Sequence, residues 1–156
     1  MMPFQAFTNK YNRIASQIIS SCEVSDFIED VSQEFSMTTF DALWDTGATC
    51  SAISKGVVKK LNLVPVSKAT VSHADGQSTV NVYDISLALP NKTLFQFVRV
   101  TECMLAGFDL LIGMDVISQG DFSISNKNGK TTFSFRIPSY EEKDFVSELD
   151  ELTHSN

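Results

Sequence analysis

Apolar and polar residues alternate along much of this chain, and a two-residue period is typical of β-strands that bury one face. The expected strands are residues 18–24, 35–44, 64–74, 78–89, 95–101, 110–113, 122–125 and 131–136. The acidic, aperiodic stretch 26–34 predicts a loop between the first two. Asp75-Gly76 and Asn128-Gly129 each separate two expected strands, and both dipeptides favour hairpin turns because their residues tolerate positive φ. The pattern therefore predicts a nearly all-β fold.

Two segments have helical character instead. Residues 54–61 predict a short helix with Ser54 as its N-cap, and residues 114–119 predict a second helix that Gly120 ends. In the acidic C-terminal tail, apolar residues recur at helical spacing. An amphipathic helix and a solvated tail are therefore equal alternatives there.

Length and composition describe a single globular domain. With 156 residues, 43% of them hydrophobic, the chain is long enough to bury one core and too short for two full ones. We assign residues 14–138 to this domain, residues 1–13 to an N-terminal extension and residues 139–156 to the acidic tail.

Charge and cysteine spacing exclude several classes of protein. The formal net charge is −7 and no clustered basic face is visible, which argues against nucleic-acid binding. No apolar run has the length of a membrane span, and polar residues interrupt the N-terminal segment too early for a signal peptide. Cys22, Cys50 and Cys103 are too widely spaced for a disulfide framework or a zinc knuckle. They fit isolated buried thiols in a reducing compartment, so we expect a cytoplasmic protein.

The candidate for chemistry is Asp45, in the motif Asp45-Thr46-Gly47. The apolar residues 42–44 lead into it, so the aspartate is expected at the end of a buried strand. A carboxylate in that position is unfavourable unless N–H donors or a partner charge receive it, and a loop of small residues supplies such donors. The plain structural alternative is an aspartate that caps a tight turn.

Residues 42–49 resemble the active-site loop of retroviral-type aspartic proteases, the retropepsin-like family. Residues 110–115 resemble the second signature of that family, two large apolar residues and a glycine before a short helix. Asp75-Gly76 lies between the two, where the family places the tip of its substrate-covering flap. The three features occur in the family's order across 35–138, and the chain is most similar to the bacterial retropepsin-like proteins.

The resemblance implies a retropepsin-like closed β-barrel subunit with a flap hairpin, and it gives residues specific roles. Asp45 would be the catalytic carboxylate, Thr46 would hydrogen-bond across a dimer axis, and Gly47 would let the backbone approach the carboxylate. The other site residues that it implies are Ala48 in the active-site loop, Leu111, Ile112 and Gly113 in the second signature, and His73, Ala74, Asp75 and Gly76 in the flap, where they would contact substrate.

The chain contains one Asp-Thr-Gly, whereas this chemistry needs two carboxylates. Asp109 and Asp115 flank the second signature but lack the loop sequence, so the second carboxylate is expected from another copy of the chain. The expected protein is a homodimeric aspartic endopeptidase that hydrolyses extended polypeptides without a metal or cofactor. Family dimers interleave their terminal strands, and here the candidates are the N-terminal strand and residues 131–136.

Other functional interpretations of these residues account for fewer of the sequence features than an aspartic protease does. A phosphoacceptor aspartate needs a parallel α/β sheet, which the chain lacks. A Ser–His–Asp triad from Ser51 and His73 has no nucleophile-elbow motif, and Cys50 is expected to be a small buried hydrophobe. The main rival to the enzyme is a dimeric module of the same fold that binds extended peptides by strand addition without useful turnover.

Overall fold

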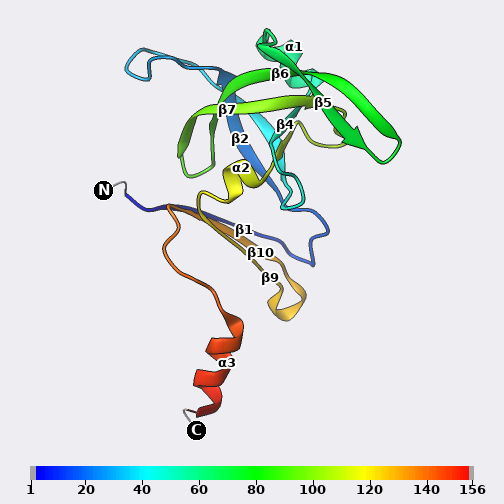
Figure 1. Ribbon diagram of the computed structural model, residues 1–156. Helices are drawn as coiled ribbons and strands as arrows, with labels where there is room; N and C mark the ends of the chain where they lie inside the picture. Colours follow the sequence, from blue (N-terminus) through cyan, green and yellow to red (C-terminus); the bar gives the residue numbers. More distant parts are fainter. Residues whose placement is uncertain (1–2, 155–156) are drawn as a thin grey trace.

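The computed structural model describes residues 3–154, which form ten strands, three α-helices and one 3₁₀ turn (Figure 1). In chain order the elements are β1 (Gln5–Lys10), β2 (Ile19–Asp26), β3 (Thr38–Trp44), β4 (Ala52–Ser54), α1 (Lys55–Leu61), β5 (Ser67–His73), β6 (Gly76–Ala88), β7 (Leu94–Cys103), β8 (Leu110–Ile112), α2 (Met114–Ile117), β9 (Asp121–Ser125), the 3₁₀ turn (Lys127–Gly129), β10 (Thr132–Ile137) and α3 (Phe145–His154). The predicted all-β fold class is confirmed.

Seven strands form the larger sheet, in the order β2-β3-β8-β4-β7-β6-β5. Most neighbours are antiparallel, but β3 runs parallel to β8 and β4 runs parallel to β7. β2 also pairs with β6, so the sheet curls back towards its first strand. The alternating residues predicted to share one face, Ile18 just before β2 and Ser20, Cys22 and Val24 within it, are all buried. The three apolar ones belong to the same core as Ile53, Ile85 and Ile112.

The second sheet has three strands in the order β1-β10-β9. In Figure 1 it lies below the larger sheet, with α2 between the two. Its central strand contributes Phe133 and Phe135, both fully buried in the common core. β1 pairs with β10 along its whole length, so residues 5–10 of the segment assigned to an N-terminal extension are part of a sheet. Met1 and Met2 of that segment lie outside the described residues.

Some element boundaries differ from those that periodicity predicts. The strand expected from Phe35 begins at Thr38, and the strand expected from Val64 begins at Ser67. The β2–β3 ladder reaches only to Val24 opposite Thr38, and the β5–β6 ladder only to Val82 opposite Ser67, although β2 and β6 themselves continue further. Phe35, Val64 and Val66 lie before those points and stay exposed, so alternation alone placed them in strands that pairing does not extend to them.

The helices follow the sequence signals closely. Ser54 caps α1, and its Oγ accepts a hydrogen bond from the N–H of Val57 at 3.3 Å. In the acidic tail the helical alternative is correct, since α3 spans Phe145–His154, and Figure 1 shows it projecting away from both sheets. Residues 155–156 of the tail are outside the described part. Within residues 3–154, no helix combines the length and apolarity that crossing a bilayer requires.

Candidate active site

Asp45 directly follows the last residue of β3, as the apolar lead-in predicts. Ala42 and Trp44 are buried, and β3 pairs in parallel with β8 from Ala42–Leu110 to Trp44–Ile112. The N–H of Asp45 donates to the carbonyl oxygen of Ile112 at 2.9 Å, so the ladder extends one residue past the strand. The two family-like signatures are therefore adjacent strands of one sheet, and Asp45 lies at their common end.

The Asp45 loop, residues 45–51, holds its carboxylate with a backbone donor. The N–H of Gly47 donates to Oδ1 of Asp45 at 2.8 Å, and the N–H of Ala48 donates to the Asp45 carbonyl at 3.2 Å. Asp45 is half-buried, while Thr46 and Gly47 are exposed. A Cβ on Gly47 would lie 3.1 Å from Oδ1 of Asp45, so glycine allows the backbone to approach the carboxylate this closely.

The second signature supports this loop from behind. Ile112 is fully buried and Leu111 is half-buried. A Cβ on Gly113 would lie 2.8 Å from backbone atoms of Cys50 and 2.9 Å from the carbonyl oxygen of Ala48. Real Cβ atoms do not approach backbone atoms this closely, so only glycine fits at this position. The structure thus brings Ala48 and the second signature together.

Trp44, the residue before Asp45, lies in an aromatic cluster that sequence reasoning did not identify. Four phenylalanine rings lie 5.0–6.1 Å from its ring centroid, namely Phe7, Phe122, Phe133 and Phe135. All four come from the three-stranded sheet, and Trp44 Nε1 donates to Oγ of Ser20 at 2.8 Å on the other side. The aromatic-rich composition was the available signal, but it does not show which rings meet. This cluster joins the small sheet to the strand that carries Asp45.

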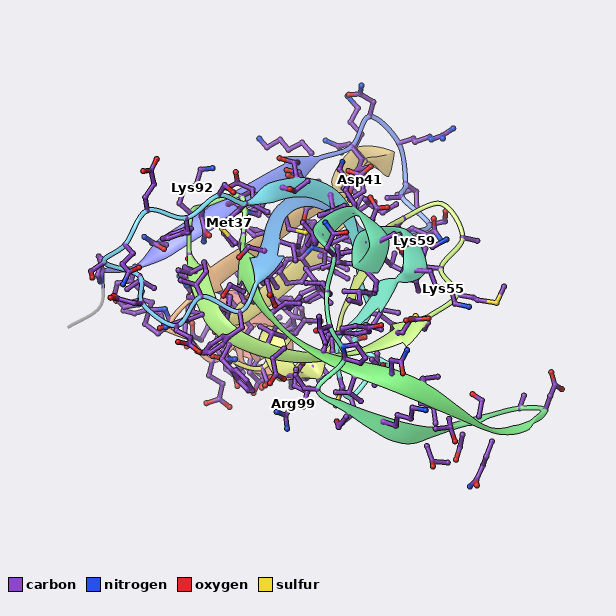
Figure 2. The ribbon with its side chains drawn as sticks, turned by 90° about the horizontal axis from the view of Figure 1, so that it is seen from above. Met37, Asp41, Lys55, Lys59, Lys92 and Arg99 are labelled. Carbon is purple, nitrogen blue, oxygen red and sulfur yellow. The ribbon has the colours of Figure 1, made fainter. Side chains whose placement is uncertain are left out.

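The predicted flap residues form the turn of a long hairpin. We call residues 67–82 the flap hairpin, because β5 pairs with β6 from Ser67–Val82 to His73–Gly76. Ala74 and Asp75 make the turn, and Gly76 has a φ of 132°, which side-chain-bearing residues rarely adopt. Figure 2 shows this hairpin extending well beyond the body of the domain.

A groove with a volume of about 840 Å³ separates the flap hairpin from the end of β7. It is lined by polar residues of β6 between Gly76 and Asn81, and by Thr101, Glu102 and Met104. Asp45 does not line this groove or the smaller cavity of about 510 Å³ beside α1. Asp75 and Gly76 of the flap tip therefore line the larger groove, whereas Asp45 lies outside both of these cavities.

The remaining acidic and nucleophilic candidates have other partners. Oδ2 of Asp109 accepts a hydrogen bond from the N–H of Asp41 at 3.1 Å, and the Asp115 carboxylate accepts two from Ser51. Ser51 is buried, consistent with its rejection as a nucleophile. Within residues 3–154, no cluster of three or more His, Cys, Asp or Glu side chains could hold a metal ion.

The cysteines are free thiols, as predicted; Cys22 is buried, as expected, whereas Cys103 is half-buried and Cys50 is exposed. Burial, reinforced by the nearby charges of Asp109, Asp41 and Glu23, raises the pKa of the Cys22 thiol to about 12. Cys50, expected to be a small buried hydrophobe, is exposed instead. Its backbone, by contrast, packs closely on Gly113.

Comparison with known proteins agrees with this geometry. Residues 31–119 match the gag-polyprotein aspartyl protease family. A retropepsin-like aspartic protease from Rickettsia conorii superposes over 86% of this chain and 96% of its own, with a TM-score of 0.54 and 14% identity. The EIAV protease, solved with the inhibitor HBY-793, covers 69% of this chain and 90% of its own, with a TM-score of 0.50 and 14% identity. No curated protein matches the chain.

At these identities the solved structures show the fold, and the family match carries the classification. The matched segment spans more than half of the chain and includes both Asp45 and Gly113. The chain therefore belongs to the gag-polyprotein aspartyl protease family and has a retropepsin-like fold.

Proposed function

We propose that this chain is one subunit of a homodimeric aspartic endopeptidase, to which each subunit contributes one catalytic Asp45. The observation that carries the proposal is the state of the Asp45 carboxylate. Gly47 N–H is its one hydrogen-bond donor within residues 3–154, and it binds Oδ1. Oδ2 is then free to face a water molecule and a second carboxylate.

Two facing carboxylates supply an acid and a base together. Like charges this close do not both ionise, so the pair shares one proton. The ionised carboxylate takes a proton from water as the water attacks the scissile carbonyl, and the protonated carboxylate donates its proton to the carbonyl oxygen. Neither step requires a metal or a cofactor. The chain's own contribution is to hold Asp45 at the end of β3 and to bind Oδ1 through Gly47.

Exposed Thr46 and Gly47 leave the tip of the Asp45 loop accessible to a second copy. Thr46 would hydrogen-bond across the two-fold axis there. The terminal strands of the two subunits would complete the contact, but residues 131–136 are an unsuitable edge because β10 already pairs with β1 and with β9. In the described sheet, β9 and β1 are the outer strands, and Ile124 of β9 is 43% exposed. The N-terminal candidate β1 therefore remains, and we add β9 as a second edge for this contact.

An extended polypeptide would bind between the Asp45 loops and the two flap hairpins. Such a peptide pairs with strand edges through its backbone, which accounts for a preference for unfolded segments. The flap residues His73, Ala74, Asp75 and Gly76 would cover it, because they form the end of the hairpin.

The direct test is Asp45→Asn, which replaces a carboxylate with an amide of nearly equal volume. Cleavage of a mixed peptide library should fall by about 10³-fold or more, since the acid–base pair is lost. Asp41→Asn is the matched control, because Asp41 is an exposed aspartate on the same strand and should leave cleavage unchanged. Thermal unfolding should be similar for all three proteins. Equal cleavage by the parent and Asp45→Asn would remove Asp45 from the mechanism.

The pH dependence separates the protease from a dimeric peptide-binding module. Activity requires the singly protonated pair, so the rate should be bell-shaped against pH with an acidic optimum. Raising the pH leaves two facing charges, which should lower the rate and loosen the dimer together. Lowering the pH protonates both groups, so the rate should fall while the dimer persists. Peptide cleavage and sedimentation over one pH series measure both; a stable dimer that cleaves nothing at any pH would instead support the binding module.

A further inference from the structure

Ser51, at the end of the Asp45 loop, is held by a carboxylate that the proposed reaction does not use. Its N–H donates to Oδ2 of Asp115 at 3.1 Å, and its hydroxyl donates to Oδ1 of Asp115 at 2.8 Å. The same hydroxyl accepts a hydrogen bond from the N–H of Gly113 at 3.1 Å. Ser51 is only 2% exposed, so water does not compete for these bonds. One serine thus joins both oxygens of Asp115 to the second signature.

Backbone hydrogen bonds extend this connection along the loop. The N–H of Met114 donates to the carbonyl oxygen of Ala48 at 2.8 Å, and the N–H of Asp115 donates to that of Thr49 at 3.2 Å. At the other end of the loop, the N–H of Asp45 donates to Ile112. The Asp45 loop is therefore fixed at both ends to four consecutive residues, 112–115.

We infer that Asp115 is a positioning residue, which rests on the proposed function: its carboxylate holds Ser51 so that the loop presents Asp45 in a reactive position. The route is short. Asp115 fixes Ser51 and Thr49, the next residues back are Ala48 and Gly47, and Gly47 N–H binds the Asp45 carboxylate. Hydrogen bonds to an ionised acceptor are stronger than neutral ones, which suits a link that must hold a loop against a moving substrate.

Asp115 is not a second catalytic acid. Ser51 uses both of its oxygens, and the N–H of Val116 also donates to Oδ1, at 3.1 Å. The bond to Val116 lies within the single turn of α2, so a purely local role would be to cap that turn. The two roles make different predictions, because a cap stabilises the fold whereas a positioning residue controls turnover in the folded dimer.

The test compares Asp115→Ala and Asp115→Asn with Asp109→Asn in the dimeric protein. Asp109 flanks the same signature on its other side and also accepts a backbone N–H, but it has no hydrogen bond to the Asp45 loop, so it is the matched control. At protein concentrations where sedimentation shows a dimer, Asp115→Ala should lower kcat about a hundredfold, as expected for a small misplacement of a catalytic group, with little change in KM. Asp115→Asn keeps one acceptor oxygen, so its kcat should fall only about tenfold.

A double substitution tests the coupling itself. Ser51→Ala should lower kcat less than Asp115→Ala, because the Ser51 N–H still reaches Asp115. The loss in the variant with both substitutions should be clearly smaller than the product of the two single losses, since either substitution removes the same hydroxyl–carboxylate bond and only the Ser51 bond to the Gly113 N–H adds a separate effect. Additive losses, or a rise in KM at unchanged kcat in the dimer, would overturn the positioning role. If Asp115→Ala fails to fold, the same comparison of kcat can be made with Asp115→Asn, Ser51→Ala and the variant that combines them.

Amide exchange gives a readout that does not need activity. The N–H groups of Ser51 and Gly113 should exchange faster in Asp115→Ala and Asp115→Asn than in the parent, and at parental rates in Asp109→Asn. If the parent cleaves nothing but these N–H groups still exchange faster in the two Asp115 variants, the contact is supported while the proposed function fails. Unchanged exchange together with unchanged kcat would overturn the inference even in an active protease.

Discussion

The Asp45 loop and the flap hairpin are the two halves of the proposed site, and they differ in how tightly the rest of the domain holds them. Residues 45–51 are bonded at both ends to 112–115, and Gly113 packs against the backbone of Cys50 too closely for any side chain. The flap hairpin pairs mainly with itself, from Ser67–Val82 to the turn, and most of its residues are exposed.

This difference separates two requirements of catalysis. A catalytic carboxylate needs a fixed position, because small displacements reduce the rate strongly. A cover needs to open for substrate and close over it, so it is drawn from parts of the fold with few buried contacts. Substitutions that disturb the loop should therefore damage stability and turnover together, whereas those in the flap should affect turnover more than stability.

The largest expected effect is that of Gly113→Ala. The new Cβ would lie 2.8 Å from the Cys50 backbone, and backbone atoms on both sides leave it no space. We expect a loss of about 3 kcal/mol in the free energy of unfolding, as for an overpacked core, together with loss of cleavage. Thermal and denaturant unfolding measure the first effect and a peptide assay the second. Gly56→Ala is the control, since its Cβ would meet only Ser54 Oγ at 3.5 Å and alanine favours the helix.

A smaller effect is expected for Gly76→Ala at the flap turn. A Cβ there would meet no atom within 4 Å, so the change acts only through the strain of a side-chain-bearing residue at a φ of 132°. We expect about 1 kcal/mol of destabilisation and a clear fall in kcat/KM. Gly129→Ala places the same kind of strain in the turn between β9 and β10, at a φ of 71°. It should lower stability similarly but leave kcat/KM intact, and equal losses of kcat/KM would contradict a special role for the flap turn.

The smallest effect is expected where the tail joins β9. Desolvation raises the pKa of the Asp121 carboxyl, but hydrogen bonds from Ser139, the Tyr140 N–H and Arg136 together lower it to about 2. A group with a lowered pKa stabilises the fold above its ordinary value of about 3.9 and loses that contribution as the pH falls through about 2. The stability difference between the parent and Asp121→Asn should be small, nearly constant above about pH 5, and should shrink progressively as the pH falls towards 2. Unfolding measured from pH 2 to 6 checks this, and a difference that grows on acidification would refute it.

Local signals in the sequence were sufficient for most elements and for the centre of the site. Alternation predicted the strands, Asp-Gly and Asn-Gly predicted the two hairpin turns, and the apolar residues before Asp45 predicted its place at the end of β3. These features depend on residues a few positions apart, so the physical chemistry that sets them is visible in a short window. The boundaries were less accurate, because the extent of a strand depends on how far its ladder with a neighbouring strand reaches.

The sequence alone thus indicated a β-rich chain of the aspartic-protease-like family with Asp45 at a strand end. Only the tertiary structure decided what holds that residue. Ser51 and Asp115 are 64 positions apart, and the phenylalanines around Trp44 come from β1, β9 and β10. The exposure of Cys50 and the place of β1 in a sheet were decided in the same way. Alternation shows that a strand has a buried face, but which strands and loops meet at that face depends on topology and close packing, which a pattern of neighbouring residues does not contain.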